Sequence, residues 1–109
     1  MLFKGKAARV EFILLCEKIR SFGWGKITLE LQSPLVQFFI HGEITKIDSK
    51  SVRVDDGASF CDVAIKDITE IQVERKETVV YSSSCAVILY YGDFPYALSK
   101  TKDQNLDKE

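Results

Sequence analysis

The feature that most constrains the fold is the alternation of apolar and polar residues in short runs from residue 26 onward. In the segment 26–33 the apolar positions are Ile27, Leu29 and Leu31. Successive side chains of a strand point to opposite faces of a sheet, so this alternation predicts a strand with one buried face. The run ends before Pro34, which favours an edge position. We therefore expect a mainly β chain built from short strands.

A second run changes phase along its length. Residues 36–41 alternate, whereas beyond Gly42 the apolar positions are Ile44 and Ile47. An extra residue in one strand shifts the alternation by one, so a bulge or sharp coil is expected near Gly42.

Turn signals separate the remaining runs. Asp56 and Gly57 supply the chemistry of a hairpin turn. Asp67 and Glu70 in the sequence DITE have the spacing of a capping box, which predicts a short helical turn. Further strands are predicted at residues 52–54, 61–65, 78–81 and 85–91, with a last short apolar piece at 96–98.

One helix is expected ahead of the strands. Between Ala8 and Phe22, apolar residues recur at intervals of three and four, and Gly23 supplies a stop signal. A chain of 109 residues matches the common size of one domain, about 100–150 residues. We therefore expect a flexible N-terminus at 1–7, a single domain at 8–99 and a polar tail at 100–109.

Composition narrows the class of function. Fifteen basic and sixteen acidic side chains give a formal net charge of -1, without the basic excess usual in a dedicated nucleic-acid binder. Cys16, Cys61 and Cys85 are odd in number and widely spaced, which favours reduced thiols in the nucleus or the cytosol. The start of the chain has neither a signal peptide's apolar stretch nor its cleavage site.

Catalytic, metal and cofactor chemistry has little support. His41 is the only histidine, and the cysteines lack the CxxC spacing of zinc and redox sites. Asp48, Asp55 and Asp56 do not form a DxDxDG loop, so turn formation explains them more simply. The glycines form neither GxGxxG nor a P-loop. A non-enzymatic protein without cofactor or metal is the expectation.

The aromatic surplus favours a protein partner. If Phe38 points inward, Phe39 points outward, and Trp24 lies in a nearby connection. Large aromatic side chains left outside a core are typical anchors of protein interfaces. The competing interpretation is a surface that binds single-stranded nucleic acid through Lys46, Lys50, Arg53 and Phe60. The carboxylates that lie among these residues in the sequence oppose a phosphate backbone.

The expected order of elements fits a five-stranded OB-like barrel with a leading helix. The alternative is a small Sm-like or SH3-like barrel built from FIHGEITKID, SVRVDD and IKDITEIQVE, which leaves residues 78–98 unexplained. Under that alternative the protein would bind RNA or assemble as a ring.

Three segments carry a more specific likeness: FILLCEKIRSFGWGKITLE, LVQFFIHGEI and VRVDDGASFCDVAI. They resemble the smaller RMI-family member, the small OB subunit of the RecQ helicase–topoisomerase III dissolvasome. The resemblance adds Arg20 and His41 to Trp24 and Phe39 as partner-binding residues. It implies a nuclear, non-enzymatic subunit that forms a heterodimer with a larger OB protein in DNA replication, DNA repair and genome stability. Phe39 stands where that family tends to carry tryptophan.

Overall fold

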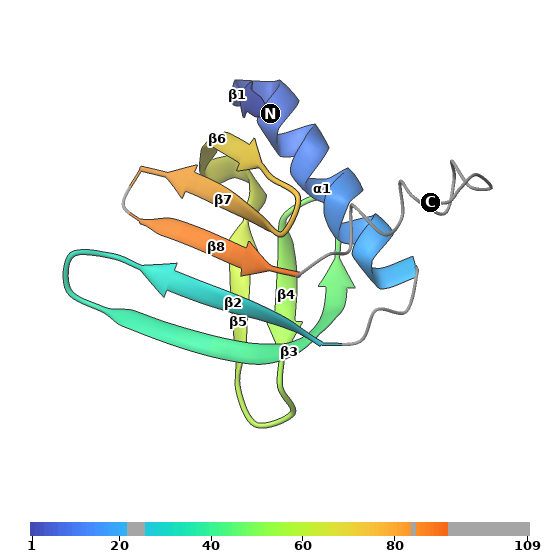
Figure 1. Cartoon of the computed structure of the whole chain (residues 1–109), viewed down its shortest axis with the longest axis vertical. Helices are drawn as coiled ribbons and strands as arrows, with labels where there is room; N and C mark the ends of the chain where they lie inside the picture. The colour runs from blue at the N-terminus through green and yellow to red at the C-terminus, as the bar shows by residue number, and fades with distance from the viewer. Residues whose placement is uncertain (22–25, 84, 92–109) are drawn as a thin grey trace.

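The computed structural model describes residues 1–21, 26–83 and 85–91. One α-helix leads into a strongly twisted antiparallel sheet (Figure 1). The elements are β1 (Leu2–Lys4), α1 (Gly5–Ser21), β2 (Ile27–Gln32), β3 (Gln37–Ile47), β4 (Ser51–Asp55), β5 (Phe60–Ala64), the 3-10 helix η1 (Ile65–Asp67), β6 (Ile68–Val73), β7 (Glu77–Ser82) and β8 (Ala86–Tyr90).

The eight strands form one open sheet in the order β1-β6-β7-β8-β2-β3-β4-β5. The expectation of a mainly β chain with a leading helix is confirmed, and so are the strands expected at residues 26–33, 78–81 and 85–91. The edge position expected for the first of these is wrong, because β2 pairs with β8 on one side and β3 on the other. The sheet has eight strands where five were expected. Its end strands, β1 and β5, do not pair with each other, so the sheet curves without closing.

Helix α1 packs one apolar face against the sheet. It packs mainly on β6 and also contacts β1 and β3. Arg9 ties the helix to the sheet, because its Nη1 donates a hydrogen bond to the carbonyl oxygen of Ile68 at 3.0 Å. No helix in the described part of the chain has the length and apolarity needed to span a membrane. The buried helical residues are Ala8, Phe12, Leu15, Cys16 and Ile19.

The phase change in β3 lies further along than expected. Ile40, Gly42 and Ile44 are all buried, so the alternation continues through the glycine. The pairing of β3 with β4 shifts between Ile44 and Lys46. Gly42 has a different role: a Cβ at this position would clash with the backbone carbonyl of Asp55. The glycine allows two neighbouring strands to approach closely.

The turn between β4 and β5 is confirmed. Asp55 accepts a hydrogen bond from the N–H of Gly57, and Asp56 accepts two from Ala58 and Ser59. Gly57 has a φ of 95°, a conformation that glycine adopts without strain.

The prediction of a helical turn at DITE is wrong. The 3-10 helix η1 has no side-chain cap and ends at Asp67, the first residue of DITE, and strand β6 begins at Ile68. The spacing of three between Ile68 and Ile71 arises because a bulge between Ile68 and Glu70 shifts the pairing of β6 with β7. Both isoleucines are therefore buried on one face of a strand.

The N-terminal residues have a structure where flexibility was expected. Residues Leu2–Lys4 pair with β6, and the Met1 ammonium donates a hydrogen bond to the carbonyl of Val73 at 2.8 Å. The backbone N–H of Val73 in turn donates to the carbonyl of Met1 at 2.7 Å. The apolar piece at 96–98 and the tail at 100–109 lie outside the described residues.

Candidate protein-binding surface

The side of the sheet that points away from the core forms a continuous surface over β2, β3, β7 and β8, which we call the outer face. Strand pairing aligns its side chains in rows. Phe39 lies opposite Glu30, Glu30 opposite Ile88, and Ile88 opposite Val79. A second row contains His41, Thr28, Tyr90 and Glu77, and a third contains Gln37, Gln32, Ala86 and Tyr81.

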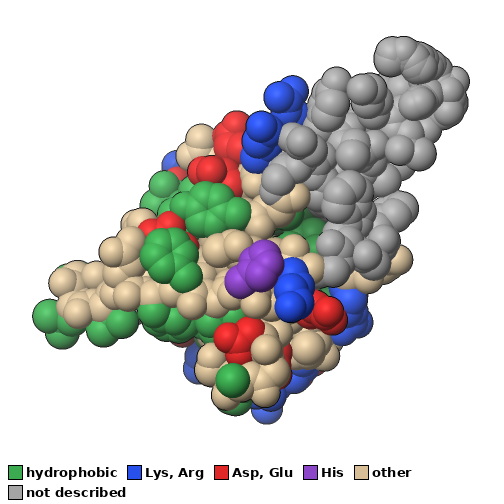
Figure 2. Space-filling view, turned by 60° about the horizontal axis from the view of Figure 1, so that its bottom comes forward, with side chains coloured by type: hydrophobic (Ala, Val, Ile, Leu, Met, Phe, Trp, Pro, Cys, Tyr) green, Lys and Arg blue, Asp and Glu red, His purple; other side chains and the backbone are tan. Residues whose placement is uncertain are grey.

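The aromatic groups of this face are accessible. Phe39 is 60% exposed and Tyr81 is 39% exposed. Because neighbouring strands are about 4.8 Å apart, the rows from β3 to β7 span about 14 Å. Figure 2 shows green hydrophobic side chains, red carboxylates and the purple imidazole gathered on one side of the molecule. The expectation that Phe39 points outward is confirmed, and Phe38 points inward, where it is half-buried against the core.

Glu30 lies at the centre of the outer face and is only 5% exposed. One carboxylate oxygen accepts hydrogen bonds from the side-chain amides of Gln32 at 2.6 Å and Gln37 at 2.7 Å. The other accepts one from the hydroxyl of Tyr90 at 2.7 Å. These donors, led by Gln32, lower the pKa of Glu30 below its usual value. The carboxylate is therefore ionised at neutral pH and holds three side chains in place.

Tyr90 is affected in the opposite direction. Its hydrogen bond to the Glu30 carboxylate raises the pKa of Tyr90 to about 12. A general acid or base works best when its pKa lies near the operating pH. The Glu30–Tyr90 pair is therefore suited to fixing side-chain positions and poorly suited to proton transfer at neutral pH.

His41 lies beside Phe39 on the outer face and is exposed. Its Nδ1 lies 3.0 Å from the hydroxyl oxygen of Thr28, directly across the strand pair. Thr28 is its one hydrogen-bond partner among the described residues. Because general-base activation of a nucleophile needs an imidazole held by a third group, this pair fits a surface contact better than a catalytic pair.

The predicted partner-binding residues are brought together only in part. Phe39 and His41 share the outer face, whereas Arg20 is exposed near the end of α1. Trp24 lies outside the described residues. Sequence reasoning missed Glu30 as the centre of the face. The sequence did mark Glu30, because it is a charged residue inside the alternating run ITLELQ. The side chains that donate hydrogen bonds to it, however, come from three positions that only the strand pairing brings together.

The predicted nucleic-acid residues are largely occupied by other groups. Arg53 donates two hydrogen bonds to the carboxylate of Asp62, at 2.8 and 3.0 Å, and its guanidinium lies 3.9 Å from the centre of the Phe60 ring. The Nζ of Lys46 lies 3.7 Å from the Oδ2 of Asp48. Lys50 is exposed at the turn before β4. Most of the positive charge is thus paired with carboxylates of the same chain.

The three cysteines, Cys16, Cys61 and Cys85, form no disulfide and differ in burial. Cys16 is buried in α1, and burial raises the pKa of its thiol. Burial also raises the pKa of the half-buried Cys61. A raised pKa lowers the thiolate fraction and hence the reactivity. Among residues 1–21, 26–83 and 85–91, no three His, Cys, Asp or Glu residues form a group that could hold a metal ion.

Comparisons with family models, curated proteins and solved structures find no match. The chemistry of the outer face is therefore the guide to function. The hydrogen-bonded Glu30 network at its centre holds side chains in place, while Phe39 remains exposed at its edge.

Proposed function

We propose that the protein is a non-catalytic binding subunit that docks a protein partner on the outer face. The observation that carries this proposal is the exposure of Phe39, at 60%, beside a carboxylate fixed by three hydrogen bonds. Burying a phenylalanine side chain contributes about 1.5–3 kcal/mol. A partner that covers the exposed 60% of Phe39 would recover a corresponding part of this free energy.

The fixed polar centre supports the same interpretation. Side chains held in one geometry before binding lose less conformational entropy when a partner arrives. The Glu30 network holds Gln32, Gln37 and Tyr90 in this way. A face with an apolar edge and an ordered polar centre fits specific binding of a complementary protein surface.

For the partner, we propose a larger OB-fold subunit in a helicase–topoisomerase complex of the nucleus. The support is the resemblance described above together with one feature of the topology. After the meander of β2 to β5, the later strand β8 returns to lie beside β2, as the last strand of a Greek key lies beside its first, and OB barrels are built on Greek keys. The finer fold class, an OB-like barrel in preference to a Sm-like one, belongs to this proposal.

The experiment is an affinity pull-down from source cells, analysed by mass spectrometry, with three versions of the tagged protein. Phe39→Ala should lose a stoichiometric protein partner that the wild type retains. Phe60→Ala is the matched control, because Phe60 is also exposed, at 52%, but lies on β5. Equal recovery with Phe39→Ala and wild type would contradict the proposal. An OB-fold protein, topoisomerase or helicase as the lost partner would support the proposed complex.

A further inference from the structure

Strand β5 is an end strand of the sheet and pairs only with β4. The N–H of Ile65 donates to Lys50, and the N–H of Asp56 donates to Ser59, so odd-numbered residues of this segment bond to β4. In an antiparallel pair, the backbone groups of alternate residues point to opposite sides. The groups that point to the free side belong to Phe60, Asp62 and Ala64.

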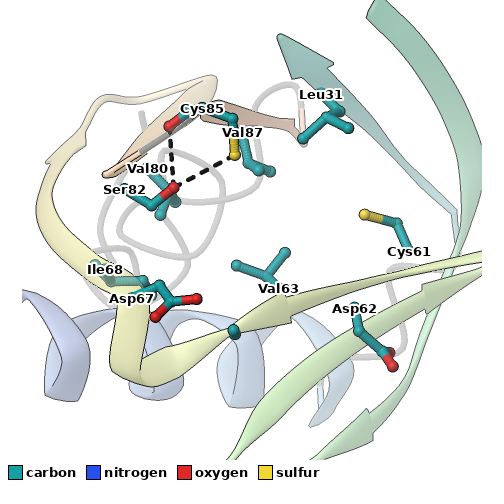
Figure 3. Close-up of a pocket in the computed structure, with 11 residues that line it drawn as sticks. Leu31, Cys61, Asp62, Val63, Asp67, Ile68, Val80, Ser82, Cys85 and Val87 are labelled. Carbon is teal, nitrogen blue, oxygen red and sulfur yellow. Dashed lines mark hydrogen bonds between the residues drawn. The ribbon is translucent and has the colours of Figure 1, made fainter. Parts of the chain in front are cut away.

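This free edge borders a groove (Figure 3). Cys61 and Val63 of β5 line one side, and Val80 of β7 and Val87 of β8 lie across from them. The groove is lined mainly by aliphatic side chains, with the hydroxyl of Ser82 at its margin. An extended chain placed here would gain both backbone hydrogen bonds and apolar contacts.

β5 lacks the features that usually keep an end strand from pairing with another chain. Natural end strands carry lysine, proline or a bulge, or are very short. The sequence of β5, FCDVA, has neither proline nor lysine, and its pairing with β4 is regular. Its one charge, on Asp62, is neutralised by Arg53. The other end strand, β1, has only three residues.

The charge of the groove indicates the chemistry of its occupant. The charged residues among its lining are Asp62 and Asp67, and the Asp62 carboxylate points away from the groove, on the face of β5 opposite Cys61 and Val63 (Figure 3). Asp62 is bound to Arg53, whereas Asp67 has no hydrogen-bond or ion-pair partner within the part of the chain that the structure describes. A second copy of β5, FCDVA, would bring no basic residue to pair with Asp67. A basic segment of another protein is the complementary occupant.

We propose that the free edge of β5 binds an extended, basic segment of a partner protein as an added antiparallel strand. Its apolar side chains face the groove, and a lysine or arginine lies beside Asp67. Main-chain hydrogen bonds give affinity in such complexes, and the alternate side chains give specificity. This surface is separate from the outer face, so its test does not depend on the proposed function.

The probe is an acetylated peptide of alternating valine and threonine with lysine at its amino-terminal end, titrated into the full chain by calorimetry. We expect saturable binding with a dissociation constant below about 1 mM. Two N-methylated peptides supply the control. Methylation of amides on the side that bonds β5 should abolish binding, and methylation of the alternate amides should leave it unchanged. Absence of binding, or an equal effect of both methylation patterns, would overturn the proposal.

The matched protein variant is Ala64→Pro. Ala64 has a φ of -75°, which is compatible with proline, and its N–H points to the free edge. The variant should keep its unfolding midpoint and lose at least about tenfold in peptide affinity, since proline lacks the donor. If it fails to fold, the methylated peptides still decide the question on the wild type. Undiminished affinity of a folded Ala64→Pro protein would refute the added strand.

A second protein variant, Asp67→Asn, tests the contact between Asp67 and the basic residue. It should lower the affinity for the lysine peptide by about two- to fivefold, as expected for an exposed ion pair, and leave the affinity for a norleucine peptide unchanged. An equal effect on both peptides would overturn the assignment of the basic residue.

Cys61 reports occupancy directly, because its thiol lines the groove. The peptide should slow alkylation by iodoacetamide, mapped by mass spectrometry, of Cys61 and of Cys85, because both line the groove. Two outcomes would overturn the proposed occupant. Protection that rises with protein concentration in the absence of peptide would indicate a second copy. Protection in dilute protein alone would indicate a segment of the same chain.

Discussion

At the scale of single residues, adjacent phenylalanines are expected to differ in what they contribute. Phe38 packs against the core, whereas Phe39 points to solvent. Phe38→Ala should lower the free energy of unfolding by about 2–3 kcal/mol, less than for a fully buried phenylalanine because Phe38 is half-buried. Phe39→Ala should change it by less than about 0.5 kcal/mol. Urea denaturation of both variants measures this, and equal losses would refute the assignment of the two faces.

Glu30 should make stability depend on pH. Because its pKa is lowered in the folded protein from the ordinary value of 4.5, its contribution is present above pH 4.5 and is lost as the pH falls through the folded pKa. Glu30→Gln should therefore be less stable than the wild type at pH 7, and the difference should shrink in acid. Glu43→Gln is the control, since Glu43 is exposed on β3. A difference between Glu30→Gln and wild type that is constant with pH would contradict the network.

At the scale of elements, the close approach of β3 and β4 requires glycine at position 42. Gly42→Ala would place a methyl group against the Asp55 carbonyl, and the two strands would have to separate. We expect a loss of about 1–3 kcal/mol or more in the free energy of unfolding, measured by thermal denaturation. Thr45→Ala, at an exposed position of the same strand, should be nearly neutral. Equal stability of both variants would argue against the close contact.

The elements were predictable where alternation was unbroken. β2, β7 and β8 follow their sequence patterns, as does the Asp56–Gly57 turn. β6 was missed because a bulge gave its isoleucines a helical spacing. β1 was missed because three residues are too few to show a period, and its partner is 66 or more residues away along the chain. The orientation of Phe39 followed from the sequence, but the Glu30 network depends on pairing across three strands.

At the scale of the whole molecule, binding to single-stranded nucleic acid is expected to be weak. Arg53 is bound to Asp62 and covers one side of Phe60, and Lys46 is paired with Asp48. Fluorescence anisotropy with single-stranded DNA at physiological salt should give dissociation constants no tighter than the roughly 10⁻⁶–10⁻⁴ M of nonspecific binding. Tighter binding that disappears when Lys46, Lys50 and Arg53 are replaced by alanine would favour a nucleic-acid surface.

We propose that the outer face is a protein interface anchored by Phe39. The most direct test is the dissociation constant of the complex with the purified partner, measured for the wild type, Phe39→Ala and Phe60→Ala. An aromatic anchor of an interface contributes about 2 kcal/mol or more, so Phe39→Ala should weaken binding by about 30-fold or more. Phe60→Ala should stay within about threefold of wild type, because Phe60 lies on β5. Equal dissociation constants for the Phe39→Ala variant and the wild type would contradict the account.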